Sequence, residues 1–202
     1  MNPGTMSQLV PSVHHVLRAA TASRHAAAGM VPAMRRIFSD DYTRVEYEAH
    51  LVRLLAFIDP IERIAARLMS VDDAMFFFRR AGALCDDLSA VGWTTGALDA
   101  VKPCDRLPAL TRAGVPGYLY VMLGSMLGGR LIAQRLRRVL GPRTSTRFYG
   151  GDTGTMAARW PAFCADLERR EHSDMISICN AANATFDTYA AWIGSDAGEI
   201  GQ

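Results

Sequence analysis

The sequence is short of cysteine, lysine and strand-like patterns, and each shortage excludes a class of protein. Its four cysteines lie far apart and form no C-x-x-C pair, so we expect free thiols in a reducing compartment rather than a disulfide framework. Lys102 is the only lysine among 22 basic residues, and the net charge is +2, so the chain as a whole has no strong attraction for nucleic acid. No alternation of apolar and polar residues is long enough to predict a β-strand.

Long hydrophobic runs are also absent. The longest stretch without a charge, residues 113–129, has 17 residues and contains Pro116 and several glycines. This length is near the lower limit for a membrane span, and a buried helix explains the stretch better. The N-terminal residues lack the basic and apolar segments of a signal peptide. These features predict a cytoplasmic protein that does not bind a membrane.

Apolar residues recur at helical spacing through most of the chain, which predicts an all-α fold of seven or eight helices in a single domain. The expected helices cover residues 12–28, 31–38, 42–69, 70–91, 108–140, 156–171 and 173–193. The domain is expected to span residues 1–202, with flexible tails at 1–10 and 195–202. The short second helix and a glycine-interrupted long helix argue against a simple four-helix bundle.

The first segment suited to chemistry covers residues 17–29. At helical spacing, Arg18, Thr21 and His25 share one face. Small residues follow His25 as far as Gly29 and leave room for a flat, bulky ligand. Neutral imidazole is a standard axial ligand of heme iron, and Arg18, about 10 Å along the helix, would reach a carboxylate at the edge of the ring. By itself this pattern is weak evidence, because a lone helical histidine is more often packed or solvated.

The second segment, residues 117–130, is an apolar helix interrupted by Gly124, Gly128 and Gly129. Each glycine costs about 1 kcal/mol relative to alanine inside a helix, so something should compensate. One explanation is close packing against another helix. The other is close approach of the backbone to a flat ligand, with a bend around it. The segment alone does not decide between them.

Together the two segments resemble the heme oxygenase family, especially its bacterial branch. Family members begin with a helix of the form L-(K/R)-x-A-T-x-x-x-H, which is matched by Leu17, Arg18, Ala20, Thr21 and His25. Their distal helix carries a G-(D/S)-x-x-G-G motif, which is matched by Gly124, Ser125, Gly128 and Gly129. The resemblance covers residues 10–193 and includes the separation of the motifs and the order of the helices.

The resemblance implies a fold in which heme lies between a proximal helix and a glycine-kinked distal helix. It implies an enzyme that uses O2 and reducing equivalents to cleave heme, its cofactor and its substrate, to biliverdin, carbon monoxide and ferrous iron. Heme would be held without a covalent link, since the sequence has no C-x-x-C-H motif. The implied partners are heme, O2 and an electron-donating reductase or ferredoxin, with a phytochrome-type photoreceptor as one destination of the biliverdin.

The resemblance also assigns residue roles. His25 would ligate the iron. The residues expected to position oxygen and water are Ser125, Gly124 and Gly128. The residues expected to bind the cofactor are Arg18, Thr21, Tyr120, Gly124, Ser125, Gly128 and Gly129, and Arg159 is a further candidate for the heme propionates.

Two positions depart from the family pattern. Many relatives carry an acidic residue four positions after the proximal histidine, where this chain has Gly29, so the usual partner of the imidazole is in doubt. Mammalian-type members have aspartate where this chain has Ser125. A serine is not a strong acid, so proton delivery would pass through ordered water.

Two alternatives stay open at this point. The first is a protein of the same fold that binds or carries heme without degrading it. The second comes from the wider group of helical proteins with this architecture, which includes thiamine-salvage enzymes and non-heme di-iron oxidases. Those enzymes need a cysteine nucleophile or a carboxylate cluster, and neither occurs here at suitable spacing.

The remaining histidines and arginines are expected to have no functional role. The histidines read as structural or solvated are His14, His15, His50 and His172. The arginines read as solvated faces are Arg79, Arg80, Arg135, Arg137 and Arg138. The run at residues 75–78 is expected to lie in the core.

Overall fold

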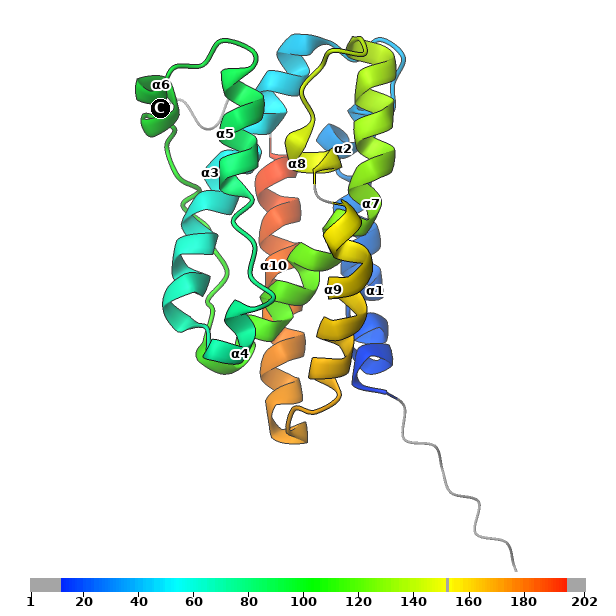
Figure 1. The fold of residues 1–202 in the computed structure, drawn as a ribbon, viewed down its shortest axis with the longest axis vertical. Helices are drawn as coiled ribbons and strands as arrows, with labels where there is room; N and C mark the ends of the chain where they lie inside the picture. Colours follow the sequence, from blue (N-terminus) through cyan, green and yellow to red (C-terminus); the bar gives the residue numbers. More distant parts are fainter. Residues whose placement is uncertain (1–11, 152, 196–202) are drawn as a thin grey trace, which may run out of the picture.

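The computed structural model describes residues 12–151 and 153–195, which form helices and loops without a β-strand (Figure 1). The helices are α1 (Val13–Met30), α2 (Pro32–Arg36), α3 (Arg44–Leu68), α4 (Val71–Ala74), α5 (Ala81–Ser89), α6 (Thr95–Asp99), α7 (Val115–Leu140), α8 (Arg147–Gly150), α9 (Thr153–Leu167) and α10 (Met175–Gly194). Single 3₁₀ turns, η1 (Arg112–Gly114) and η2 (His172–Asp174), precede α7 and α10. The predicted all-α fold is confirmed, and the tails expected at 1–10 and 195–202 lie outside the described residues except for Ser195.

Helix α10 runs through the middle of the molecule and packs against α1, α7 and α3 (Figure 1). Its buried face carries Ile178, Ala182 and Phe186. Helix α7 crosses α10 so closely that a Cβ atom at Gly117 would overlap the carbonyl oxygen of Ile178. Glycine is therefore required at this crossing, because any side chain would push the two helix backbones apart.

Helix α7 is continuous, but Figure 1 shows it changing direction part-way along its length. It begins at Val115 rather than at residue 108 as expected, because Thr111 caps the preceding 3₁₀ turn and Pro116 occupies the first turn of the helix. A proline is well tolerated there because the first turn has no backbone acceptor for its missing N–H. The three glycines of the second motif lie in the middle of this helix.

Residues 70–91, expected to form one helix, form α4 and α5 with a non-helical segment at 75–80 between them. In that segment the Phe76 ring turns into the core and packs edge-on against Phe163, with 5.3 Å between ring centroids. The buried carboxylate of Glu62, on α3, then accepts the backbone N–H groups of Arg80 and Ala81 at 2.5 and 3.3 Å. A carboxylate at this place stabilises a helix start, so α5 begins at Ala81.

Another buried carboxylate fixes the start of α8, a short helix that lies in an expected loop. Asp87 of α5 accepts the backbone N–H groups of Arg147 and Phe148 at 2.7 and 2.9 Å. It also accepts the hydroxyl of Ser145 at 2.6 Å. These bonds fix the backbone that presents Phe148 and Tyr149 to the interior.

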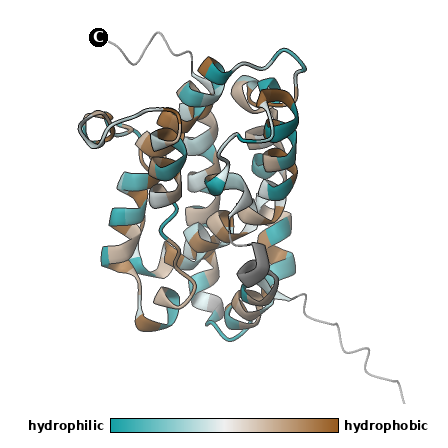
Figure 2. Cartoon of the chain, turned by 45° about the horizontal axis from the view of Figure 1, so that its top comes forward, coloured by the Kyte–Doolittle hydropathy of each residue, from teal (hydrophilic) through white to brown (hydrophobic). Residues whose placement is uncertain are grey.

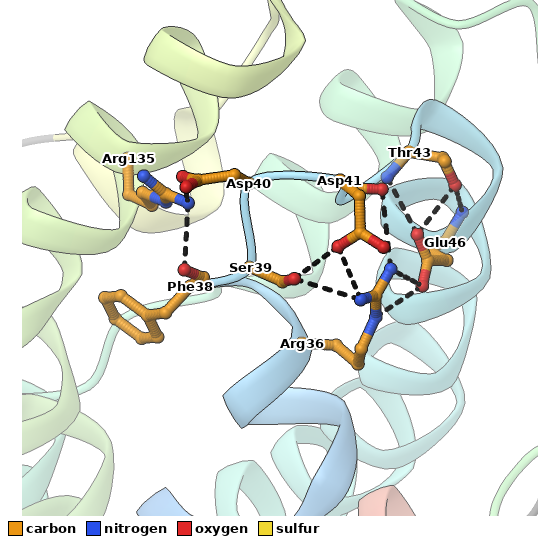
Figure 3. Close-up of polar contacts among 8 residues, drawn as sticks. All are labelled: Arg36, Phe38, Ser39, Asp40, Asp41, Thr43, Glu46 and Arg135. Atoms are coloured by element: carbon orange, nitrogen blue, oxygen red, sulfur yellow. Dashed lines mark hydrogen bonds and ion pairs between the residues drawn. The ribbon is translucent and has the colours of Figure 1, made fainter.

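The connection between α2 and α3 is held by ion pairs around Arg36 (Figure 3). The Arg36 guanidinium donates to Asp41 at 2.7 Å and to Glu46 at 2.8 Å. Glu46 also accepts the backbone N–H of Thr43 at 2.8 Å, while the Thr43 hydroxyl accepts the N–H of Glu46. This reciprocal pair is a capping box, and it sets the first turn of α3.

Arg135 of α7 ties the same connection to the long helix (Figure 3). Its guanidinium donates to the carbonyl of Phe38 at 2.8 Å and to the carboxylate of Asp40 at 2.7 Å. The side chain is only 16% exposed. The expectation that Arg135 belongs to a solvated face was therefore wrong, because the loop folds over it.

Most helices carry both hydrophilic and hydrophobic residues along their length (Figure 2), as expected when one face packs in the core and the other meets water. Across residues 12–151 and 153–195, no helix has the length and apolar character needed to cross a bilayer. The apolar stretch at 113–129 instead covers the end of η1 and the first half of α7, which is buried from Val115 to Leu119 and from Val121 to Leu123.

Candidate functional site

A cavity of about 660 Å³ lies between α1 and α7, with α3, α8 and α10 forming its inner side. This volume is within the range of pockets that enclose a ligand the size of a drug or a cofactor. The lining is largely apolar, with polar side chains from α1, α7, α8 and α10 and from Arg80, the residue before α5. The two motifs singled out from the sequence therefore face the same space.

Helix α1 forms one wall of the cavity. Its lining residues are His14, Arg18, Thr21, Ala22, His25, Ala28 and Gly29. The predicted residues Arg18, Thr21 and His25 are thus brought together on one face. The Thr21 side chain is buried, and its hydroxyl donates to the carbonyl of Leu17 at 2.8 Å. The Thr21 hydroxyl hydrogen is therefore used within α1, and the side chain helps to form the cavity wall without offering a free hydrogen-bond donor to a ligand.

The His25 side chain is exposed to the cavity and leaves its ring nitrogens available. Its ring lies edge-on to Phe186 of α10, with 5.6 Å between the centroids. Gly29, one turn further along, also lines the cavity and has no side chain to reach the imidazole. The structure thus places the His25 imidazole at the cavity wall with no side chain at position 29 to pair with it.

Helix α7 forms the opposite wall. Its lining residues are Tyr120, Val121, Met122, Gly124, Ser125, Leu127, Gly128 and Ile132. A Cβ atom added at Gly128 would have no neighbour within 4 Å, and one at Gly124 would be in ordinary contact with Trp160 at 3.6 Å. No neighbouring element therefore demands glycine at these two positions. Their absent side chains widen the cavity, which favours the ligand explanation of the motif there.

Two candidate residues lie away from the cavity. A Cβ atom at Gly129 would overlap the carbonyl oxygen of Tyr149, so this glycine allows α8 to approach α7. Arg159 places its guanidinium over the Phe78 ring, 4.0 Å from the centroid. The glycine motif therefore serves both purposes, with Gly124 and Gly128 at the cavity and Gly129 in the packing of helices.

Arg80 and His14 are polar residues that line the cavity although the sequence did not predict them there. Arg80 was expected on a solvated face, which is wrong: its side chain is buried, because the chain turns inward before α5. The guanidinium donates to the Ser125 hydroxyl at 2.7 Å and to the carbonyl of Phe148 at 3.0 Å, and it stacks on the Phe148 ring at 4.0 Å. Burial lowers the pKa of Arg80 to about 10, so the group is still protonated at neutral pH.

The sequence profile of the heme oxygenase family matches residues 12–195. The chain belongs to the heme oxygenase family. The predicted family and enzyme class are thereby confirmed. A curated heme oxygenase from Xanthomonas campestris pv. campestris (strain 8004) is 35% identical over 161 residues, which cover 77% of this chain and 92% of that relative.

Solved heme oxygenases have the same fold. The structure of heme oxygenase from Leptospira interrogans superposes with a TM-score of 0.73 at 17% identity, covering 91% of this chain and 99% of that one. The structure of heme oxygenase-1 from the cyanobacterium Synechocystis sp. PCC6803, in complex with heme, superposes with a TM-score of 0.70 at 16% identity and covers 94% of both chains. The expected heme oxygenase-like fold is confirmed.

The di-iron alternative has no matching ligand set in the heme oxygenase fold of this chain. Among the described residues, no group of three or more His, Cys, Asp or Glu side chains is arranged to hold a metal ion. A heme needs only one protein ligand, and the exposed imidazole of His25 lines the cavity as the predicted residue for that role.

His50 lies behind the cavity and was expected on a polar helix face, which is wrong. Its ring is buried and bonds through Nε2 to the hydroxyl of Tyr149 at 2.6 Å. Burial lowers the pKa of His50 to about 4, with the positive charge of Arg53 adding to the effect. The imidazole is therefore neutral at pH 7, and it holds a tyrosine that lines the heme oxygenase cavity.

Glu62 also lies behind the cavity and titrates near neutrality. Burial raises its pKa to about 7 from the ordinary 4.5, although the two N–H groups it accepts act in the opposite direction. The folded protein therefore holds this proton more tightly than the unfolded chain between these two pH values. The stability that comes from the neutral carboxyl is fully present below about pH 4.5 and is lost as the pH rises through about 7.

Replacing Glu62 with glutamine is expected to remove this pH dependence. Relative to Glu62→Gln, the wild-type free energy of unfolding should fall by about 3 kcal/mol between pH 4.5 and 7.5. Urea unfolding of the heme-free proteins at a series of pH values measures this difference. His50 has the opposite slope, but both proteins contain it, so its effect cancels. Parallel curves for the two proteins would contradict the assignment.

Proposed function

We propose that this chain is a heme oxygenase that uses O2 and reducing equivalents to cleave heme to biliverdin, carbon monoxide and ferrous iron. The observation that carries the proposal is the cavity, which has the His25 imidazole on one wall and the small residues Gly124, Ser125 and Gly128 on the other. Membership of the family and the fold shared with a heme oxygenase solved in complex with heme support it.

The residues at the cavity fit heme in three respects. An imidazole with free nitrogens suits the iron, and a largely apolar lining suits the porphyrin faces. Two arginines, Arg18 and Arg80, line the same cavity and suit a ligand with negative groups. No carboxylate is found among the described lining residues, so nothing in that lining repels the acidic side chains of heme.

Each wall has its own task in the proposed reaction. His25 holds the iron from α1, and Arg18 and Tyr120 are the candidates to hold the propionates. Heme itself supplies the oxygen chemistry, so the protein's contribution is to orient the ring and control water. On the α7 wall, Gly124 and Gly128 leave room for oxygen beside the backbone.

Ser125 can orient a water molecule but has little to offer as an acid. Its hydroxyl hydrogen is used on the carbonyl of Met122 at 2.8 Å, and its oxygen accepts from Arg80 at 2.7 Å. An oxygen in this state has one further lone pair, which can accept a hydrogen bond from water in the cavity. On this wall Ser125 would therefore supply a hydrogen-bond acceptor for water beside the heme and not an acid.

The proposed reaction consumes electrons, and its source of electrons determines the protein partner. Electrons must come from outside, so we propose an electron-donating reductase or ferredoxin as partner and the cytoplasm as the location. The described cysteines are free thiols, which is consistent with a reducing compartment. We propose supply of biliverdin to a phytochrome-type photoreceptor as the use of the product, resting on the family resemblance alone.

The decisive experiment adds hemin to the purified protein and then ascorbate or a ferredoxin–reductase system in air. A heme oxygenase should lose its Soret band as biliverdin absorption grows, with release of carbon monoxide. A stable Soret band under both donors would overturn the enzyme and favour the alternative, a protein that carries heme without degrading it.

A further inference from the structure

Arg80 is a buried cation that faces the heme cavity and has neutral partners. The residue is 6% exposed, and the hydrogen bonds of its side chain go to a serine hydroxyl and a backbone carbonyl. The carboxyl group that faces it, Glu62, gives its oxygens to the backbone N–H groups of Arg80 and Ala81 instead. The guanidinium charge is therefore not neutralised by an ion pair with its acidic neighbour.

The other ionisable groups around Arg80 are phenols. They are Tyr118 of α7, Tyr149 of α8 and Tyr189 of α10. Burial raises the pKa of each of them above the ordinary value, so they are neutral at physiological pH. The wall of the cavity around Arg80 thus carries a full positive charge, and the one acidic group beside it, Glu62, is only partly ionised at neutral pH.

A buried charge without an ion-pair partner lowers the stability of the folded protein, because it loses its hydration. An apolar residue of similar length at position 80 would fill the same space without the cost of desolvation. Perturbed, buried charges that open into a cavity are typical of functional sites. A purely structural arginine would gain more from an acidic partner than from two neutral oxygens.

The hydrogen bonds of Ser125 show how the Arg80 guanidinium is oriented. The Ser125 oxygen accepts from Nη1 of Arg80, and the hydroxyl donates to Met122 within α7. The helix therefore fixes the hydroxyl, and the hydroxyl fixes one end of the guanidinium. Phe148 fixes the other end through its carbonyl and its ring.

We propose that Arg80, held by Ser125 and Phe148, makes the α7 wall an anion-stabilising site that favours small anions bound to the heme on the side opposite His25. Arg80 acts as a positioning residue that supplies a fixed positive field, and Ser125 keeps it aligned. The inference rests on the proposed function, because it requires heme in the cavity.

The test compares anionic and neutral ligands of the heme-loaded protein. Azide is titrated against the ferric form and carbon monoxide against the ferrous form, each followed by the Soret band. In Arg80→Met the dissociation constant for azide is expected to rise about tenfold, because a charge-assisted interaction is lost. That for carbon monoxide, a neutral ligand, is expected to change by less than about twofold. Arg80→Lys should keep most of the azide affinity.

Arg79→Met is the matched control. Arg79 is adjacent in sequence, and its side chain is 66% exposed. Its Nη2 lies 3.6 Å from Oδ1 of Asp59, and the residue is not part of the cavity lining. The azide affinity of Arg79→Met should equal that of the wild type. If Arg80→Met fails to fold, Ser125→Ala replaces it, with a smaller rise for azide alone expected.

Four outcomes would overturn the proposal. Unchanged azide affinity in Arg80→Met would show that the charge has no effect on the ligand, and unchanged affinity in Ser125→Ala would show that Ser125 does not align it. An equal loss for azide and carbon monoxide would show a structural change of the pocket. A wild-type protein that binds no heme would refute the proposed function together with this inference, whereas the first three outcomes leave the proposed function standing.

Discussion

Replacing His25 with alanine is expected to eliminate the axial ligand and to reduce heme degradation by at least about 100-fold. Loss of a residue that only orients a metal ligand already costs 10- to 100-fold in many sites, so loss of the ligand itself should cost more. The readouts are the Soret spectrum of the hemin complex and the rate of biliverdin formation. The reason is structural, because His25 is exposed and lines the cavity from α1, among the small residues Ala22, Ala28 and Gly29.

His15→Ala is the matched control for this experiment. His15 lies on the same helix and is exposed, but it does not line the cavity. Its spectrum and rate should match those of the wild type. Free imidazole should restore part of the lost spectrum to His25→Ala, since the cavity left by the side chain opens to the ligand. An unchanged spectrum in His25→Ala would mean that another residue ligates the iron.

Replacing either packed glycine of α7 with alanine is expected to destabilise the protein by about 3 kcal/mol. The added methyl group would overlap the backbone of α10 at Gly117 and the backbone of α8 at Gly129. Backbone cannot move aside as the end of a long side chain can, so the helices themselves must shift. Thermal or urea unfolding of the heme-free variants measures the loss.

Gly128→Ala is the matched control on the same helix. No atom lies within 4 Å of the new methyl group, and alanine is the better helix former, so heme-free Gly128→Ala should be more stable by about 0.5–1 kcal/mol. Because Gly128 lines the cavity, the same variant should bind heme more weakly. Equal stability of Gly128→Ala and Gly129→Ala would contradict the division of the motif between ligand and packing.

The sequence correctly predicts which residues line the cavity where helical spacing alone determines the face on which they lie. Arg18, Thr21 and His25 reach one wall because helical periodicity places them on one face, and Gly124, Ser125 and Gly128 reach the other wall for the same reason. The roles of these residues in binding and catalysis stay predictions. The bounds of the helices are predicted less well where a tertiary contact sets them, as at Ala81, whose N–H is accepted by Glu62 of α3.

Residues whose burial depends on distant parts of the chain could not be predicted. Arg80 and His50 are polar side chains that local pattern places in water, and only the packing of α5, α7 and α8 encloses them. Gly129 fits the family motif, but its neighbour is a carbonyl 20 positions later in the chain, from Tyr149. An inward turn just before a helix, such as that at Arg80, has no strong signal in a single sequence.

The two buried carboxylates, Glu62 and Asp87, have a consequence for the electric field inside the cavity. The oxygens of both carboxylates accept hydrogen bonds from the backbone N–H groups at the starts of α5 and α8. These acidic groups behind the cavity therefore stabilise the helices that surround it. Dissolved ions screen exposed pairs such as Arg24 with Asp187 over about 10 Å at ordinary ionic strength, but they reach enclosed charges far less. On the proposed function, the field of the buried Arg80 at the ligand is set when the chain folds, and we expect changes of salt in the surrounding solution to leave it almost unaltered.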